Sequence, residues 1–191
     1  MRRLLSLAFV VVLAGCAGTP RPALEHVDDF QLDRYLGTWH QIATIPAWFQ
    51  DQCVGDAQAV YALDEANPGL VVVTNSCRVE SGATDVAEGR ARFVGPPSEG
   101  RLEVTFISLF GHWIWPIPGG YVVVALDPDY RWVLVGHPTR DYAWILARDR
   151  TLPDSTLLAL RQTLQRNGYD PCRLLLTEPG RNGPSLCTVA G

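Results

Sequence analysis

The side chains with the most chemical reactivity in this sequence are five cysteines and four histidines. No two cysteines show the C-x-x-C spacing, and no histidine lies within a few residues of a cysteine, so the ligand pattern of a zinc site is missing. The chain also lacks the G-x-S-x-G and H-E-x-x-H patterns, which supply the nucleophile or the metal ligands of many hydrolases. We therefore expect no metal, no cofactor and no catalytic residue, and we interpret the histidines (His26, His40, His112, His137) as surface or loop residues.

Four of the cysteines form an even set typical of disulfides in an exported chain, and four cysteines allow three pairings. The turn signal Asn67-Pro68-Gly69 predicts a hairpin, and Cys53 and Cys77 lie near its open ends. We favour a Cys53–Cys77 bridge, although the register is offset by a few residues and requires a bulge or a loop. Cys172–Cys187 then follows by elimination; mapping of a Cys53–Cys172 or Cys53–Cys187 link would overturn this choice.

The fifth cysteine ends an N-terminal targeting pattern. Arg2 and Arg3 precede an apolar stretch at residues 4–13, which is too short to span a bilayer and indicates a signal peptide. The following Leu13-Ala14-Gly15-Cys16 resembles the lipobox of bacterial lipoproteins, which implies lipidation of Cys16. Ala17 stands where an inner-membrane retention signal would have Asp, so the resemblance implies an anchor in the outer membrane, facing the periplasm. We divide the chain into a signal peptide (1–15), a lipidated cysteine and tether (16–29), a folded domain (30–178) and a C-terminal tail (179–191).

The charge pattern excludes nucleic acid as a partner. The formal net charge is −4, and no basic run follows residue 3, whereas nucleic-acid binding requires clustered cations.

The middle of the chain shows the pattern of an all-β fold. Short β-type runs alternate with Gly/Pro-rich turns, and we expect strands near 39–46, 57–64, 70–77, 86–94, 101–107, 120–127, 131–137 and 142–148. A helix follows, with Thr151 as N-cap of a capping box, an apolar stripe at Leu157, Leu160 and Leu164, and Gly168 as its C-terminal glycine. A last short strand is expected near 173–177. The predicted fold is an eight-stranded antiparallel up-and-down β-barrel with a C-terminal α-helix, large enough inside for one small ligand.

Three short motifs in order give this pattern a family resemblance. Tyr35-Leu36-Gly37-Thr38-Trp39 opens the first strand, Leu126-Asp127-Pro128-Asp129-Tyr130 forms the turn between the sixth and seventh strands, and Arg148 ends the eighth. Together they resemble the lipocalin family, and in particular its bacterial outer-membrane lipoproteins. The resemblance implies that Arg148 crosses over the ring of Trp39. We therefore assign structural roles, not ligand contacts, to Gly37, Trp39, Asp127, Tyr130 and Arg148.

Candidate ligand contacts follow from strand alternation and from the loops expected at the open end of the barrel (46–55, 78–85, 108–119 and 138–141). Alternation from Trp39 places Gln41, Ala43 and Ile45 inside, and small residues such as Ala57, Ala59 and Ala125 would leave space if they face inward. Tyr121, Tyr142 and Arg90 offer polar groups for a carboxylate or phosphate. The full predicted set is Ala43, Ile45, Trp48, Phe49, Arg90, Phe106, Trp113, Trp115, Tyr121, Val123, Tyr142 and Trp144.

The expected function is binding and storage or transport of a lipid, as the lipocalin resemblance implies for a lysophospholipid or fatty acid at the outer membrane. Two alternatives remain open. One is a lipocalin-fold enzyme acting on an apolar substrate, which reactive thiols of low pKa would favour. The other is an interaction protein that forms a homodimer through the unusually apolar loop containing Trp113 and Trp115.

Overall fold

A computed structural model describes residues 22–115, 120–177 and 183–189. The predicted signal peptide, Cys16, the first part of the predicted tether, part of the 108–119 loop and part of the C-terminal tail lie outside these residues.

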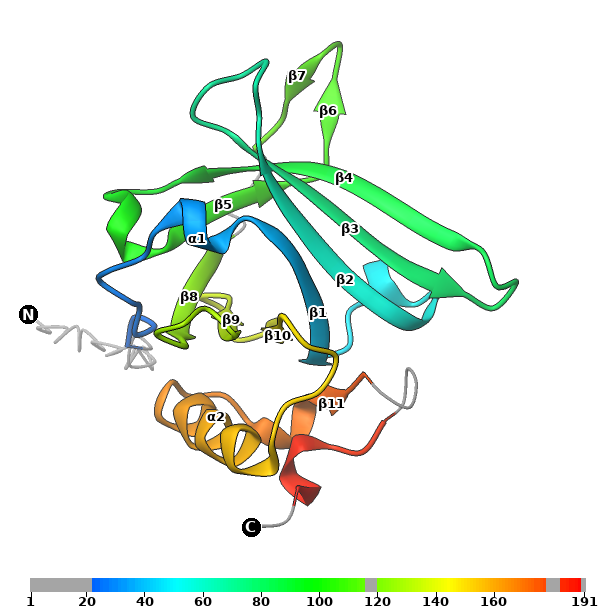
Figure 1. The fold of residues 1–191 in the computed structure, drawn as a ribbon, viewed down its shortest axis with the longest axis vertical. Helices are drawn as coiled ribbons and strands as arrows, with labels where there is room; N and C mark the ends of the chain where they lie inside the picture. The colour runs from blue at the N-terminus through cyan, green and yellow to red at the C-terminus, as the bar shows by residue number, and fades with distance from the viewer. Residues whose placement is uncertain (1–21, 116–119, 178–182, 190–191) are drawn as a thin grey trace, which may run out of the picture.

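The described chain forms one closed antiparallel β-barrel (Figure 1). Neighbouring strands follow the order β10-β9-β8-β5-β4-β3-β2-β1, and pairing of β10 with β1 closes the sheet into an eight-stranded barrel. This confirms the predicted fold class. The barrel strands are β1 (Gly37–Thr44), β2 (Cys53–Leu63), β3 (Val71–Val79), β4 (Thr84–Phe93), β5 (Arg101–Thr105), β8 (Gly120–Leu126), β9 (Trp132–Gly136) and β10 (Ala143–Ala147).

Several short strands and helices accompany the eight barrel strands. The strands β6 (Ser108–Leu109) and β7 (His112–Trp113) form a separate hairpin, and β11 (Leu175–Leu176) extends the sheet beside β1, where a last strand was expected. The helical elements are α1 (Leu32–Tyr35), η1 (Trp48–Gln50), η2 (Pro97–Glu99), α2 (Asp154–Arg166), η3 (Pro171–Arg173) and η4 (Leu186–Thr188). Over the described ranges, no helix has both the length and the apolar character needed to cross a bilayer.

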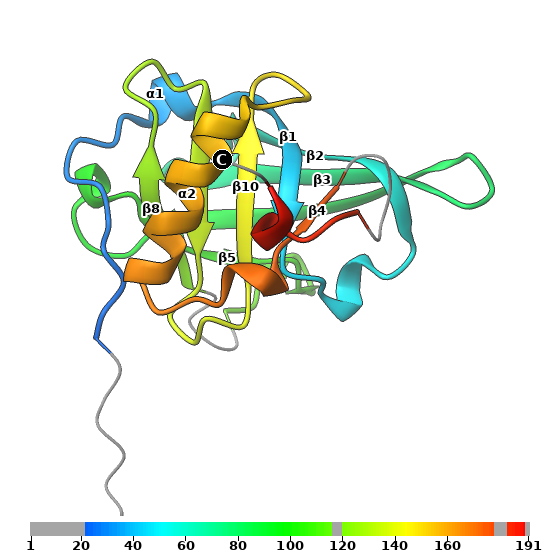
Figure 2. The same cartoon turned by 90° about the horizontal axis from the view of Figure 1, so that it is seen from below.

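The helix α2 covers the outside of the barrel wall formed by β8 and β10 (Figure 2). Its stripe of Leu157, Leu160 and Leu164 is buried, as the spacing predicts. Gly168 adopts φ +77° and donates to the Gln165 carbonyl, while Tyr169 N–H donates to the Leu164 carbonyl, so the helix ends in a Schellman motif.

The predicted N-cap of this helix is wrong. The helix begins at Asp154, and Pro153 occupies the N-cap position without a side-chain cap. Pro153 has an extended ψ of 144°, so it stays outside the helix instead of forming its first turn, and Thr151 lies two residues too early to cap it.

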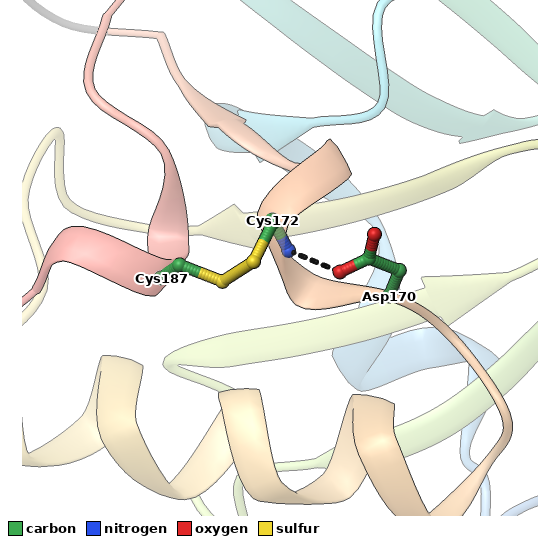
Figure 3. A group of neighbouring side chains, drawn as sticks. All are labelled: Asp170, Cys172 and Cys187. Carbon is green, nitrogen blue, oxygen red and sulfur yellow. Dashed lines mark hydrogen bonds between the residues drawn. A yellow bond between two sulfur atoms is a disulfide. The ribbon is translucent and has the colours of Figure 1, made fainter.

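The C-terminal segment is tied back by the Cys172–Cys187 disulfide, which confirms the favoured pairing together with Cys53–Cys77. Asp170 lies beside the bridge, but its carboxylate accepts a hydrogen bond from Cys172 N–H at 2.9 Å and caps η3 (Figure 3). Both sulfur atoms are used in the disulfide, so this trio lacks the thiolates that would make it a metal site.

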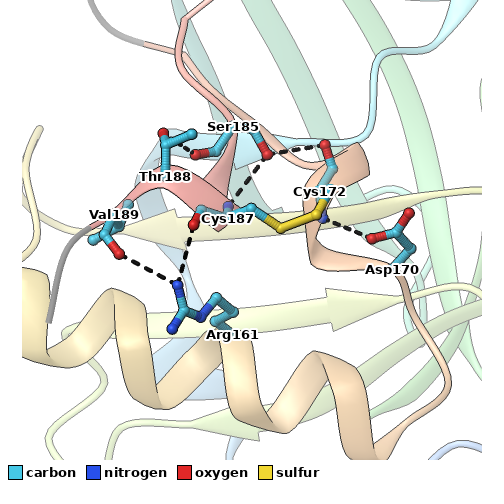
Figure 4. Close-up of a disulfide and its surroundings, with 7 residues drawn as sticks. All are labelled: Arg161, Asp170, Cys172, Ser185, Cys187, Thr188 and Val189. Atoms are coloured by element: carbon cyan, nitrogen blue, oxygen red, sulfur yellow. Dashed lines mark hydrogen bonds between the residues drawn. A yellow bond between two sulfur atoms is a disulfide. The ribbon is translucent and has the colours of Figure 1, made fainter.

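Further hydrogen bonds surround that disulfide (Figure 4). The Ser185 hydroxyl donates to the Cys172 carbonyl and accepts from Cys187 N–H, and Arg161 of α2 donates to the carbonyls of Cys187 and Val189. Leu186 is fully buried against the same cluster as α2. Residues 183–189 therefore belong to the packed structure.

The chain has two apolar cores on opposite sides of the barrel wall. One fills the closed end of the barrel interior, around Trp39, Val123, Val133 and Val135. The other lies between the wall and α2 and includes Leu134, Ile145 and Leu160. Alternate residues of β9 thus serve different cores, as the two-residue period of a strand requires.

A clasp between Arg148 and Trp39 closes the barrel end. The Arg148 guanidinium lies 3.8 Å from the centre of the Trp39 ring and donates hydrogen bonds of 2.8–2.9 Å to the carbonyls of Thr38, Arg34 and Leu36. Trp39 Nε1 donates to the Tyr35 carbonyl at 2.8 Å. The predicted crossing of Arg148 over Trp39 is confirmed.

The backbone conformation at position 37, next to this clasp, requires glycine. Its φ of +93° lies in the region that L side chains rarely adopt, and a Cβ there would stand 3.5 Å from Arg148 Nη1.

The Asp127–Tyr130 turn braces the same end. Asp127 binds the Arg131 guanidinium through two hydrogen bonds of 2.9 Å and accepts from the backbone N–H of Asp129. The Tyr130 hydroxyl accepts from Gln31 N–H, and the Arg34 guanidinium stacks 4.2 Å from the Tyr130 ring centre. The second motif therefore links the β8–β9 hairpin to the segment that precedes β1.

The described part of the predicted tether, residues 22–29, packs against the folded domain. Leu24 is buried in the cluster under α2, Val27 N–H donates to the Val123 carbonyl, and Glu25 N–H donates to Asn167 Oδ1. Sequence inspection missed this because a Pro-containing stretch without periodicity still packs when a wall and a helix end offer it partners.

The clasp makes a first stability prediction. Arg148→Lys keeps the charge but loses the planar stack and the forked hydrogen bonds, so we expect the free energy of unfolding to fall by about 1–3 kcal/mol. Urea unfolding measures this change in the free energy of unfolding. Arg166→Lys, on the exposed face of α2, is the matched control and should change stability by less than about 0.5 kcal/mol. Equal stabilities for both variants would refute a holding role for the clasp.

The Asp127–Tyr130 turn leads to a second prediction, which concerns the stability of the fold at acid pH. Hydrogen bonds from Arg131 lower the pKa of Asp127, so acidification protonates this carboxyl in the unfolded chain before it does so in the fold. The unfolded state then binds more protons, and stability falls as pH drops below the usual Asp range of about 4. Asp127→Asn should therefore be less stable than the wild type near neutral pH, with a gap that narrows on acidification. Chemical unfolding at several pH values measures this; a gap independent of pH would contradict it.

Candidate functional site: an open apolar cavity

The barrel interior holds a cavity of about 530 Å³ above the packed closed end. This volume lies in the range of small-molecule binding sites. Its wall is mostly apolar or small, with a few amide and hydroxyl groups. The lining residues are Gln41, Trp48, Phe49, Gln50, Gln52, Cys53, Ala57, Gln58, Ala59, Tyr61, Val73, Asn75, Ser76, Cys77, Asp85, Ala87, Val104, Thr105, Phe106, Ile107, Gly120, Tyr121, His137, Tyr142, Trp144 and Leu146.

Small residues on two strands keep the cavity hollow. Ala57 and Ala59 face inward from β2, as the sequence suggested, and Ala87 faces inward from β4. At Gly89, a Cβ would lie 2.4 Å from the Thr105 carbonyl oxygen and 2.8 Å from the Phe106 ring. The missing side chain lets Phe106 lean over β4 toward the cavity.

Three tyrosine hydroxyls form the floor. The Tyr121 hydroxyl is hydrogen-bonded to Tyr35 at 2.5 Å and to Tyr61 at 3.0 Å. The Tyr35 ring packs on Trp39 with 4.8 Å between ring centroids, so the floor rests on the clasp. Burial raises the pKa of Tyr61 to about 12 and those of Tyr35 and Tyr121 well above their usual value, so all three phenols are neutral at physiological pH.

The open end is rimmed by aromatic side chains. Phe49 packs against Tyr142 with ring centroids 5.6 Å apart, and Tyr142 stacks on Trp144 at 6.1 Å. Trp48 meets Phe49 edge to face at 5.7 Å. The Cys53–Cys77 disulfide fastens the β2–β3 side of this rim.

Six predicted ligand contacts line the cavity: Trp48, Phe49, Phe106, Tyr121, Tyr142 and Trp144. Their contact with a ligand stays a prediction. Leu146 also lines the cavity, on the face of the last barrel strand where alternation with Tyr142 and Trp144 predicts it, whereas Tyr61, Val73 and Val104 line the cavity but were not predicted. Alternation along β2 from Ala57 and Ala59 would have found Tyr61.

The inward placement of Ala43 and Ile45 is wrong. Both are buried in the cluster between the wall and α2, because β1 has a register shift against β10 between Gln41 and Ala43. This bulge reverses the alternation, so Gln41 lines the cavity while Ala43 pairs with the outward Ile145. A similar shift in β8 between Val123 and Ala125 turns Ala125 outward.

The other predicted ligand contacts that do not line the cavity lie either deeper in the barrel interior or outside the barrel. Val123 faces inward but is fully buried in the packed closed end, below the cavity. Arg90 lies on the outer face of β4, where it pairs with Asp64 at 2.6 Å and Glu88 at 2.9 Å.

Trp113 and Trp115 also lie outside the barrel. The Arg90 guanidinium stacks 4.7 Å from the Trp113 ring centre and that of Arg92 lies 4.3 Å from Trp115. These two cation–π contacts hold both indoles against β4, away from the cavity.

Comparisons with known proteins agree with this architecture. Residues 30–179 match the model of the lipocalin-like domain. The chain is 36% identical over 174 residues to the outer membrane lipoprotein Blc of Escherichia coli K12, covering 91% of this chain and 93% of that protein. It is 34% identical over 173 residues to temperature-induced lipocalin-1 of Arabidopsis thaliana, covering 90% and 91%.

Among solved structures, insecticyanin of the tobacco hornworm Manduca sexta aligns with a TM-score of 0.61 and 21% identity, covering 81% of this chain and 84% of that one, which shows a shared fold. The closed barrel with an open apolar cavity defines a protein of the class that binds small hydrophobic ligands. The chain belongs to the lipocalin family.

The tyrosine floor makes a third prediction. Tyr121→Phe leaves the buried hydroxyls of Tyr35 and Tyr61 without their shared partner, so we expect the free energy of unfolding to fall by about 1–3 kcal/mol. Tyr142→Phe is the control, since its hydroxyl makes no hydrogen bond within the described residues. Thermal and urea unfolding compare the two variants, and equal stability would argue against a hydrogen-bonded floor.

Proposed function

We propose that this lipocalin binds and stores or transports a single-chain lipid, a lysophospholipid or a fatty acid, in its barrel cavity. The observation behind this proposal is the hollow upper half of the barrel. Burial of about ten methylene groups there would contribute roughly 8 kcal/mol before ordering costs, which suffices for micromolar binding without a dense polar network.

The charges around the cavity favour one orientation of the lipid. Of the described residues that line it, none is an arginine, and the sequence contains no lysine. A charged head group buried at the neutral tyrosine floor would therefore have no counter-ion, at a large desolvation cost. The acyl chain enters first, and the head group stays at the aromatic rim in contact with water.

Binding is favoured over catalysis because the cavity offers little reactive chemistry. Its two cysteines are joined in a disulfide, so neither can act as a thiolate nucleophile. Ser76 also lines the cavity, but among the described residues Asp85 is hydrogen-bonded to Gln52 and His137 to Thr139, and neither is hydrogen-bonded to the Ser76 hydroxyl, so no activated nucleophile is assembled.

We also propose that Cys16 is lipidated and that the protein is held at the periplasmic face of the outer membrane. Support comes from the lipobox-like Leu13–Cys16 segment and from the similarity to proteins named outer membrane lipoproteins. Homodimer formation through Trp113 and Trp115 has less support, because both indoles are engaged by arginines of the same chain.

A pair of neighbouring substitutions tests lipid binding. Ala87 faces the cavity and Val86 faces solvent on the same strand. Ala87→Phe fills space that an acyl chain needs, so we expect at least about a tenfold weaker affinity for palmitate and 1-palmitoyl-lysophosphatidylcholine, whereas Val86→Phe should bind like the wild type. Titration calorimetry measures both.

Native mass spectrometry of the protein purified from its own membrane should, in addition, show a bound mass in the range of one single-chain lipid. Equal affinity of the two variants, or no lipid binding at all by the wild type, would refute the proposed function.

A further inference from the structure

The open end of the barrel carries most of the exposed apolar surface in the described chain. Seven of the ten exposed large hydrophobic side chains belong to η1 or to residues 106–114. We define the apolar rim as Trp48, Phe49, Phe106, Ile107, Leu109 and Phe110. Trp48 is 77% exposed and Phe110 is 92% exposed, although both are costly to leave in water.

The rim is continuous with the cavity. Trp48, Phe49, Phe106 and Ile107 all line its mouth, and the β6–β7 hairpin that presents Leu109 and Phe110 starts directly after Ile107. An apolar body that covers Trp48, Phe49, Phe106 and Ile107 therefore also covers the entrance to the cavity.

The N-terminal end of the described chain lies at the same end of the barrel. The buried Arg140, in the loop between β9 and β10, donates to the Pro22 carbonyl at 2.6 Å and to the Asn167 carbonyl at 3.1 Å. His137 and Tyr142 of this loop line the cavity mouth. In Figure 2 the described chain begins in blue at the lower left, level with this loop and with the cyan η1 at the lower right, and runs up to α1 at the closed end.

The length of chain before Pro22 then limits where a lipid anchor can be. Only six peptide units separate Cys16 from Pro22, and a fully extended chain of that length spans about 20 Å at most. Acyl groups on Cys16 would thus hold the membrane within a short distance of the cavity mouth. This step rests on the proposed lipidation and is independent of which ligand fills the cavity.

We infer that the open end of the barrel docks on the bilayer that holds the lipid anchor, with the apolar rim inserted at the level of the lipid head groups. Trp side chains are enriched at this depth of a membrane, and Trp, Phe and Leu form the apolar face of segments that lie in the membrane interface. Lipid then passes between the bilayer and the cavity without crossing water.

The charges beside the rim indicate how the contact is made. Asp51 and Asp85 are exposed next to it, so anionic lipids gain no attraction there. Docking is driven by apolar insertion and should be insensitive to salt, in contrast to proteins that bind membranes through basic patches.

The experiment uses the full lipidated protein in vesicles of phosphatidylcholine with brominated acyl chains, which quench tryptophans at the membrane. We expect Trp48 to account for most of the quenched emission, so Trp48→Phe should remove most of the quenching. Trp132→Phe, at the closed end and packed against the cluster under α2, is the control and should leave it unchanged. The quenching should persist at high salt.

Two further variants keep the test decisive. Phe110→Ser, at the exposed hairpin tip, should weaken the quenching of Trp48 while the circular dichroism spectrum stays unchanged. The cavity-filled Ala87→Phe should still be quenched, because quenching from docking does not require a lipid inside the barrel. This result separates docking from lipid binding: if lipid binding fails, Trp48 quenching remains.

Three outcomes would overturn the inference: equal quenching of the wild type and Trp48→Phe, loss of quenching in Ala87→Phe, or a Trp48 that is shielded from acrylamide but untouched by brominated lipid. The last result, with a cross-linked dimer, would identify a second copy of the chain as the body that covers the rim.

Discussion

The stacking of Arg148 on Trp39 is the contact on which the rest of the barrel depends. It joins the residue that follows β10 to β1, where the sheet closes on itself, and its guanidinium donates hydrogen bonds to three backbone carbonyls at that end. Trp39 in turn supports Tyr35, and Tyr35 supports the hydroxyl cluster that forms the cavity floor. The closed end is filled in this way, which leaves the hollow space at the other end.

The barrel wall has to serve two cores at once, and the bulges in β1 and β8 make this possible. Below each bulge a strand sends one set of residues into the interior, and above it the alternation is reversed. The reversal puts Ala43 and Ile45 under α2, so neither enters the interior, while Gln41 of β1 still lines the cavity. Outer packing against the helix and an empty upper interior are therefore two results of the same irregularity.

The cavity and its surroundings form a gradient from a neutral polar floor, through an apolar shaft, to an aromatic rim. Such a gradient suits a molecule with a long apolar part and one polar end. The arginines of β4 do not take part, since Arg90 and Arg92 hold the indoles of Trp113 and Trp115 on the outer face. The hydrogen bond from Arg140 to the Pro22 carbonyl places the start of the described chain beside the cavity mouth. The cavity entrance and the proposed lipid anchor therefore lie at the same end of the barrel.

By itself the sequence determined the local features: the turns, the helix stripe and its glycine end, the three motifs, both disulfides and the number of barrel strands. The turns, the helix and the Cys53–Cys77 bridge depend on neighbours in the chain or on a hairpin, so spacing indicates them, whereas Cys172–Cys187 followed by elimination and the Arg148–Trp39 crossing from the family resemblance. Only the tertiary structure decided which residues face the cavity, because a bulge in β1 arises from pairing with β10, more than a hundred residues away. The outward position of Arg90 and the packing of residues 22–29 likewise depend on partners from distant strands and from the end of α2.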